Sequence, residues 1–168
     1  MSTCYTSRVL YTAELSGVID EDTQDVAGIY ALTFTRLKRE ALGAFQSKGI
    51  KDGPPFIPAY FIGQFAVAKA YQKQGLAGGL VKDIFQFLLE QAERGIPAPL
   101  IYLDTSQQQA ASFWRHMGFT LCPELGMNAM VKELNDIAET AEAALEEAKS
   151  TCKHKSSVSQ RQLAGAHS

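Results

Sequence analysis

The sequence predicts an α/β fold, in which strands lead into helices along one chain. Tyr60–Val67 is an apolar run rich in aromatic and branched residues, which is typical of a strand buried on both faces. A glycine-rich turn follows, and beyond it leucine and isoleucine recur every four residues, which indicates a helix. Leu100–Leu103 is a second apolar strand, and a second helical stretch from Gln107 to Met117 comes after it.

The composition indicates one domain without a membrane segment. The chain has 168 residues, of which 46% are hydrophobic, and this is enough for a proper core. Its 16 basic and 18 acidic side chains give a formal charge of −2, so no global charge favours a nucleic acid or an anionic membrane. No apolar run reaches the roughly 20 residues that span a bilayer.

Three cysteines, Cys4, Cys122 and Cys152, are widely spaced along the chain. They form neither a disulfide framework nor a set with metal-ligand spacing, so we expect no metal site. Unpaired cysteines are typical of a reducing compartment, and the sequence therefore predicts a cytoplasmic protein.

The N-terminal part predicts an antiparallel hairpin. Arg8–Leu15 and Val26–Phe34 have the composition of strands, and Gly28 is a candidate bulge. Ser16–Asp25 lies between them and is rich in acidic residues. We expect a solvated loop here, and the alternative is an acidic lip that attracts a cationic substrate.

Thr35–Pro58 is the most basic stretch and connects this hairpin to the central strand. We expect a short amphipathic helix in it, followed by an extended approach through three prolines. The basic side chains are either solvated or in contact with RNA phosphates. The apolar face of the expected helix comprises Leu37, Ala41, Leu42 and Phe45.

The turn Gln72–Gly79 predicts an anion site. A turn with few side chains at the start of a helix leaves several backbone N–H groups unpaired, and such groups bind phosphate. The sequence has neither the Gly-Lys-Ser or Gly-Lys-Thr ending of a Walker loop nor the glycine frame of the dinucleotide fingerprint. The alternative is that Gly75, Gly78 and Gly79 serve only tight helix packing.

Two motifs together resemble the GNAT N-acetyltransferases, over Arg8 to Leu134. The first is the frame Gln-x-x-Gly-x-Ala, directly after an apolar strand, which is similar to the acyl-CoA-binding signature of that family. The second follows the strand Leu100–Leu103 and has the family's order of an amide side chain, an alanine, an aromatic pair and Gly-Phe. The matching positions are Gln72, Gly75 and Ala77 in the first motif, and Gln107, Ala110, Phe113-Trp114 and Gly118-Phe119 in the second.

The resemblance implies a mixed, mostly antiparallel sheet that is flanked by helices and split around an acyl-CoA, with acetyl-CoA as the acyl donor. It implies a bulge near Phe65 and Val67 that frees backbone groups for the pantetheine amides, and a diphosphate held by the turn. The implied cofactor-binding residues are Phe65, Ala66, Val67, Gln72, Lys73, Gln74, Gly75, Leu76, Ala77, Gly78, Gln107, Ala110 and Phe113.

Trp114 holds the position in which many GNAT relatives have a tyrosine that protonates the leaving thiolate. An indole N–H donates a hydrogen bond but gives no proton, so Trp114 is the catalytic candidate only as a donor to the sulfur. No carboxylate base is evident on the central strand, where Gln64 stands instead. We expect His116 at the surface.

The resemblance implies an N-acetyltransferase that transfers an acetyl group directly to a primary amine. A likeness to the GNAT toxins that acetylate aminoacyl-tRNA rests on the prolines before Tyr60 and on Phe65-Ala66-Val67, so the acceptor is an aminoacyl-tRNA or a protein. The alternative is a weak or inactive GNAT fold that binds a protein or RNA. The family normally has a strand and two helices ahead of the hairpin, and this sequence departs from that pattern.

The C-terminal part predicts two short strands, a helix and a tail. Phe119–Cys122 and Met127–Val131 are the expected strands. We expect Met127 and Met130 in the core, and the alternative is an adaptable substrate surface. An apolar stripe through 134–148 either packs on its own domain or pairs with a helix of a partner, such as a second copy in a homodimer. The expected divisions are a GNAT-like acyl-CoA-binding domain over 1–133, a helix over 134–150 and a flexible tail over 151–168.

Overall fold

The computed structural model describes residues 3–10, 13–43, 53–95, 98–105 and 108–143. The chain divides into two compact units, Met1–Leu134 and Asn135–Ser168, which are described separately. Gln107 and the tail 151–168 lie outside the described residues.

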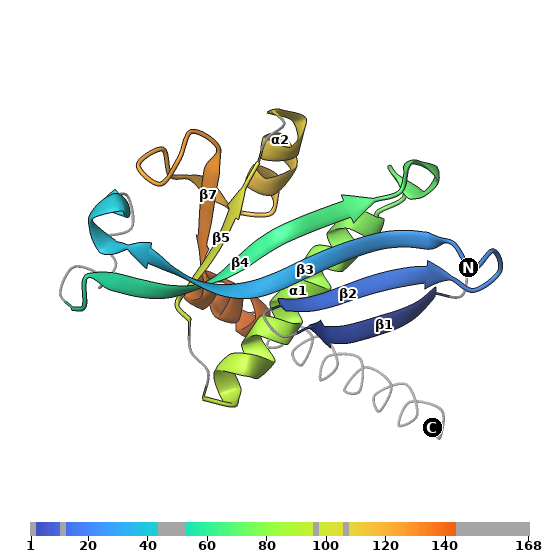
Figure 1. Ribbon diagram of the computed structural model, residues 1–168, viewed down its shortest axis with the longest axis horizontal. Helices are drawn as coiled ribbons and strands as arrows, with labels where there is room; N and C mark the ends of the chain where they lie inside the picture. Colours follow the sequence, from blue (N-terminus) through green and yellow to red (C-terminus); the bar gives the residue numbers. More distant parts are fainter. Residues whose placement is uncertain (1–2, 11–12, 44–52, 96–97, 106–107, 144–168) are drawn as a thin grey trace, which may run out of the picture. The chain divides into compact units, whose positions relative to one another are not determined.

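The first unit contains a seven-stranded sheet in the order β1-β2-β3-β4-β5-β7-β6 (Figure 1). Neighbouring strands are antiparallel except for β4 and β5, which are parallel. The predicted mixed, mostly antiparallel sheet is therefore confirmed. The strands are β1 (Thr3–Leu10), β2 (Ala13–Asp20), β3 (Val26–Lys38), β4 (Phe56–Val67), β5 (Leu100–Asp104), β6 (Thr120–Leu121) and β7 (Ala129–Glu133).

The parallel pair β4 and β5 separates partway along its length. Its register runs from Ala59 opposite Leu100 to Ile62 opposite Leu103 and stops there, although β4 continues to Val67. Figure 1 shows the two strands diverging, so that β5 leads toward α2 (Gln108–His116) and β4 toward the turn before α1 (Leu76–Glu93). A split between parallel strands exposes backbone groups of both strands to a ligand.

Helix α1 crosses between the two parallel strands and packs on the sheet. The stripe expected from the sequence is buried except at its start: Leu80, Ile84 and Leu88 each have 0% exposure, whereas Leu76 is half-buried. A β-carbon added to Gly28 would lie 2.8 Å from Leu80 Cδ1, so the helix approaches the sheet closely at β3. The bulge expected at Gly28 lies one residue earlier, at Ala27. Val18 pairs with Gly28 and Ile19 with Val26, which leaves Ala27 unpaired.

The predicted strand Arg8–Leu15 is wrong, because two strands share that stretch. β1 ends at Leu10 and β2 begins at Ala13, and the two pair in an antiparallel hairpin. The predicted loop Ser16–Asp25 is also too long, since β2 continues to Asp20 and buries Val18 completely. The exposed connection before β3 is limited to residues 21–25.

The predicted amphipathic helix in the basic stretch is wrong over the residues that the structure describes. Leu37 belongs to β3, and Arg39–Ala41 form a single turn of 3₁₀ helix called η1. Leu37 and Leu42 pack with Ile57, because β3 and β4 pair as far as Lys38 and Phe56. Phe45 lies outside the described residues.

The last strands begin later than the sequence predicts. β6 comprises only two residues, and β7 begins at Ala129. Met130 is fully buried as expected, whereas Met127 is 89% exposed and its prediction as a core residue is wrong. Met127 lies in the turn between the two strands, where the chain reverses and no neighbouring element covers it.

The second unit is described as far as residue 143. Residues 134–143 are helical, in agreement with the start of the helix expected over 134–150. Within this helix the Thr140 hydroxyl donates a hydrogen bond of 2.6 Å to the Asp136 carbonyl. Among the helices in the described ranges, none has the length and apolar character needed to cross a membrane.

Candidate functional site

The start of α1 presents backbone N–H groups that the helix itself does not use. The first helical hydrogen bond is donated by the Gly79 N–H to the Gly75 carbonyl at 3.1 Å. The N–H groups of Leu76, Ala77 and Gly78 come before it and have no acceptor within the helix. No side chain of the N-cap residue accepts from them, and the first turn contains no acidic residue. The positive end of the helix is therefore not neutralised locally.

The turn before α1 has a backbone shape that favours glycine. Gly75 is the N-cap residue and has a φ of 84°, in the left-handed region where residues other than glycine are strained. Lys73 has a φ of 61° and an exposed side chain. Both left-handed residues lie in the turn that leads from β4 into α1.

Three side chains hold this turn in place: Gln72 and Tyr71 bond to the ends of strands, and Gln74 bonds to the preceding 3₁₀ turn η3 (Lys69–Tyr71). Gln72 Nε2 donates 3.0 Å to the Val67 carbonyl at the end of β4, and Gln74 Nε2 donates 2.8 Å to the Ala70 carbonyl. The Tyr71 hydroxyl donates 2.8 Å to Asp20 Oδ2 at the end of β2. This last bond lowers the pKa of the Asp20 carboxyl below its usual value.

The three glycines of the turn face open space. A β-carbon added at Gly75, Gly78 or Gly79 would meet no described atom within 4 Å. The alternative that these glycines serve tight helix packing is therefore wrong for the part of the chain that the structure describes. Their missing side chains leave room beside the unpaired N–H groups.

The bulge in β4 lies earlier than the resemblance implied. Ala31 pairs with Gln64 and Leu32 with Ile62, so Gly63 is the unpaired residue, two positions before Phe65. The position of the bulge matches the end of the β4–β5 ladder at Ile62. The strand can bend away at this point because Gly63 carries no side chain, and the backbone of 63–67 is left without β5 beside it.

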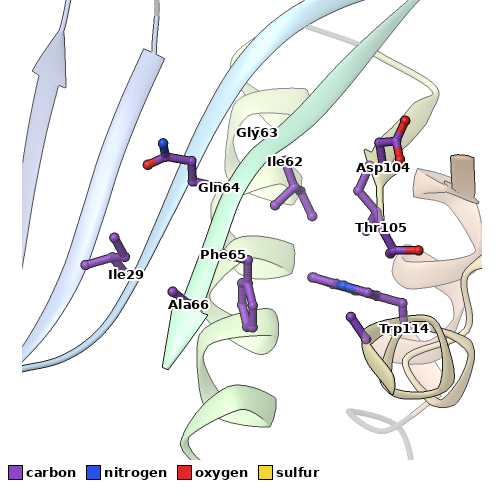
Figure 2. Close-up of a pocket in the computed structure, with 11 residues that line it drawn as sticks. Ile29, Ile62, Gly63, Gln64, Phe65, Ala66, Asp104, Thr105 and Trp114 are labelled. Carbon is purple, nitrogen blue, oxygen red and sulfur yellow. The ribbon is translucent and has the colours of Figure 1, made fainter. Parts of the chain in front are cut away.

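A pocket of about 420 Å³ occupies the split (Figure 2). Its walls are polar and apolar in similar proportion, and polar side chains lie on two sides: Gln64 on one, Asp104 and Thr105 on the other. The lining comes from β3, β4, β5 and α2. It comprises Ile29, Ile62, Gly63, Gln64, Phe65, Ala66, Leu103, Asp104, Thr105, Ala110 and Trp114.

Trp114 forms part of the pocket wall within an aromatic cluster. Its side chain is 5% exposed, and its ring makes edge contacts with Phe65, Phe113 and Phe119 at centroid distances of 5.0, 5.2 and 5.1 Å. Phe113 also stacks on Phe65 at 5.9 Å. Figure 2 shows the indole reaching from α2 toward Phe65 across the split. The tryptophan is thus fixed by packing, with its polar edge at the pocket.

The structure brings together part of the set expected from the sequence. The pocket is lined by Phe65, Ala66, Ala110 and Trp114, and the ring of Phe113 stacks on that of Phe65. The adjacent strand end, turn and helix start comprise Val67, Gln72, Lys73, Gln74, Gly75, Leu76, Ala77 and Gly78. His116 is exposed, as expected.

Sequence reasoning missed the other polar side of the pocket. Asp104 and Thr105 follow the last paired residue of β5, and they enter the site only because Leu103 lies opposite Ile62. The signal was an acidic residue directly after an apolar strand that precedes a helix. Gln64 was considered only as the residue that replaces a base.

A mixed sheet that is split between two parallel strands, with an uncapped helix start next to the split, defines an α/β protein built to hold an extended anionic ligand. The family model described as acetyltransferase (GNAT) domain matches residues 18–121, which is more than half of the chain. The chain therefore belongs to the GNAT acetyltransferase family, and the resemblance inferred from the two motifs is confirmed. No curated protein matches the chain significantly.

Solved structures support the fold independently. A structure described as AtaT complexed with acetyl-methionyl-tRNAfMet has a TM-score of 0.69 and 21% identity, and the match covers 77% of this chain and 75% of that chain. A tyrosine-to-phenylalanine mutant of KacT has a TM-score of 0.68 and 18% identity, with the same coverage. AtaTR bound with AcCoA has a TM-score of 0.61 and 20% identity, and the match covers 77% of this chain and 74% of that chain.

Proposed function

We propose that the chain is an N-acetyltransferase that transfers the acetyl group of acetyl-CoA directly to a primary amine. The observation that carries the proposal is the uncapped start of α1. It follows the part of β4 that no longer pairs with β5. An extended ligand with an anionic middle and a neutral arm fits this arrangement. Unpaired N–H groups suit a diphosphate, and a bare strand edge suits the amides of pantetheine.

The chain's own residues divide the binding of acetyl-CoA between them. The N–H groups from Lys73 to Gly78 hold the diphosphate, and Lys73 adds a positive charge next to them. Gln72 supports the turn through its side chain, because its own N–H donates to the Lys69 carbonyl at 3.3 Å. The backbone of Phe65, Ala66 and Val67 pairs with the pantetheine arm. Ala110 and Phe113 border the arm from α2, where Gln107 is also assigned. Acetyl-CoA supplies the activated acetyl thioester, and the pocket between β4 and β5 receives that end.

Trp114 determines how the leaving thiolate is stabilised. An indole N–H stabilises a developing thiolate by a hydrogen bond, and the thiolate then takes its proton from solvent. General acid catalysis contributes about 10² to 10⁴ in rate where it operates, so this chain is slower than a relative with an acid at this position. Direct attack by the amine remains feasible because a thiolate is a fair leaving group.

We propose an aminoacyl-tRNA as the amine acceptor, in preference to a protein. AtaT has been solved with acetyl-methionyl-tRNAfMet, and its fold covers most of this chain. The outer face of β3 and β4 supports the idea: Arg36 lies 4.9 Å from the centroid of the Phe56 ring, and Phe34 is 53% exposed. Exposed aromatic rings next to cations suit bases and phosphates of a nucleic acid.

A weak or inactive fold that binds a macromolecule is the second candidate. The observation that favours it is Trp114, which replaces the usual acid and is packed tightly among phenylalanines. The two candidates differ in one measurement. Release of free thiol from acetyl-CoA in the presence of charged tRNA supports the enzyme, and stoichiometric tRNA binding without thiol release supports the binding protein.

The remaining proposals concern assembly and location. The apolar stripe over 134–148 supports pairing with a second copy of the chain, which sedimentation at several concentrations would test. We keep the division into a domain over 1–133, a helix over 134–150 and a flexible tail over 151–168. The cytoplasm is the proposed compartment, supported by the buried free thiol of Cys122.

A further inference from the structure

We propose that Asp104 binds the ammonium group of the acceptor and orients its nitrogen toward the thioester, an inference that rests on the proposed function. Among the lining residues of the pocket, Asp104 is the one with an ionisable side chain. It is exposed, so an acceptor that arrives from solvent can reach it. Figure 2 shows it across the pocket from Gln64, with Ile62 between them and with Thr105 and Trp114 below it in the view.

The backbone holds Asp104 in a fixed place. It is the last residue of β5 and pairs with Ala129 of β7. The next residue, Thr105, donates both its N–H at 3.0 Å and its hydroxyl at 3.3 Å to the Asn128 carbonyl. Thr105 is 5% exposed, so the carboxylate stands on an anchored strand end beside the split. A group that must position a substrate benefits from such rigid support.

No protein cation uses the Asp104 carboxylate in the part of the chain that the structure describes. The salt bridge found there joins Lys38 to Glu40, and no hydrogen bond reaches the Asp104 side chain. The charge of Asp104 also affects a neighbouring side chain. Burial of Tyr102 is the main cause that raises its pKa, and the charge of Asp104 raises that pKa further. A carboxylate that has no partner among the described residues and lies at a pocket is a site for a positively charged partner.

The chemistry assigns this carboxylate to the amine and not to the thioester. An ionised carboxylate has only acceptor oxygens, so it cannot polarise the thioester carbonyl, which needs a donor. A primary ammonium has three donors and matches it. Once the amine has lost a proton, a remaining N–H still donates to Asp104, and the lone pair then points away from the carboxylate toward the carbonyl carbon.

The transfer balances with Asp104 in this role. The ammonium releases one proton to solvent, and its nitrogen lone pair forms the new C–N bond. The C–S bond breaks, and the thiolate takes a proton from solvent. The amide nitrogen releases its second proton, so the net products are the acetylated amine, free CoA and one proton.

The test compares the full-length protein with Asp104→Asn, which keeps the side-chain shape and removes the charge. The control is Glu93→Gln, which neutralises an exposed acid at the end of α1 outside the pocket. The probes are methioninamide, phenylalaninamide and Nα-acetyl-lysinamide. Calorimetry with saturating CoA at about pH 6.5, where these amines are charged, measures their binding without reaction. Thiol release from acetyl-CoA is measured with the same amines and with hydroxylamine, which is uncharged at neutral pH.

The expected result is that Asp104→Asn weakens binding and kcat/KM for at least one charged amine by about ten- to hundredfold, because a hydrogen bond to a charged group is lost. Transfer to hydroxylamine and all properties of Glu93→Gln stay unchanged. Equal activity of Asp104→Asn on charged amines overturns the inference and leaves the proposed function standing. Loss on hydroxylamine as well, or transfer by the wild type to hydroxylamine alone, also overturns it. No transfer to any of these probes, together with no thiol release in the presence of charged tRNA, overturns the proposed function itself.

Discussion

Replacing Gly78 with glutamate should stabilise the protein and weaken the binding of acetyl-CoA. Gly78 lies in the first turn of α1, and an added side chain meets no described atom within 4 Å. Glutamate is favoured over glycine in a helix by about 0.5–1 kcal/mol. An acid in the first turn gains about 0.3–1 kcal/mol from the helix dipole. The free energy of unfolding should therefore rise by about 1–2 kcal/mol.

The same charge should repel the diphosphate. Two unit charges about 5 Å apart at an effective dielectric constant of about 20 repel by about 3 kcal/mol, which weakens binding about a hundredfold. The assay pairs thermal unfolding without ligand, where Tm should rise by about 2–8 °C, with calorimetry of acetyl-CoA binding. Gly78→Gln is the matched control: it gains the helix propensity without the charge and should keep more of the affinity.

An anion site at this helix start is refuted if Gly78→Glu binds acetyl-CoA as tightly as Gly78→Gln does. A fall in Tm for both variants would refute a different step, namely that the space beside Gly78 is open. Because stability and affinity are expected to move in opposite directions, simple misfolding cannot imitate the predicted result.

Three further substitutions test other parts of the site. Tyr71→Phe should lower stability at neutral pH, and its difference from the wild type should begin to close below about pH 3.8. It should be lost as the pH falls through the lowered pKa of the folded Asp20 carboxyl, because protonation removes the charged acceptor of the bond. Gly28→Ala should cost about 1–3 kcal/mol in denaturant unfolding, because the new methyl group would overlap with Leu80. Trp114→Tyr should lower Tm by loss of packing and raise kcat at least about tenfold in a thiol-release assay, because a phenol can protonate the thiolate.

Each of these expectations has a contradicting result. A stability difference for Tyr71→Phe that persists unchanged at pH 2 would show that the bond to the carboxylate is not its cause. Gly43→Ala is the control for Gly28→Ala, since its nearest contact is an ordinary 3.7 Å, and equal losses in both would remove the packing argument. A Trp114→Tyr variant with unchanged kcat would show that the missing acid does not limit the rate.

The sequence predicted best those features that depend on a regular local pattern. The four-residue stripe of Leu80, Ile84 and Leu88 reports one helix face directly, and all three are buried. It failed at Arg8–Leu15, because Tyr11 and Thr12 favour strands and no glycine or proline marks the break between β1 and β2. Met127 failed for a related reason, since an apolar side chain in a turn has the same local pattern as one in a strand.

The site was predictable where a motif implied its backbone and not where distant strands meet. The turn from Gln72 to Gly78 was found because its glycines and its following helix are contiguous in sequence. Asp104 was not singled out, because an acid after a strand is common and its place in the pocket depends on the register that sets Leu103 opposite Ile62. The bulge was expected near Phe65 and Val67 and lies at Gly63. A resemblance to a family does not say which residues of neighbouring strands pair with each other.

Calorimetry with CoA and with pantetheine tests whether the amide groups at the start of α1 bind the diphosphate. Pantetheine has the same arm and thiol but no diphosphate. We expect the protein to bind CoA, and pantetheine to bind at least about a hundredfold more weakly, since it lacks the charged contacts. Equal affinity for the two ligands, or no binding of CoA, would contradict this expectation.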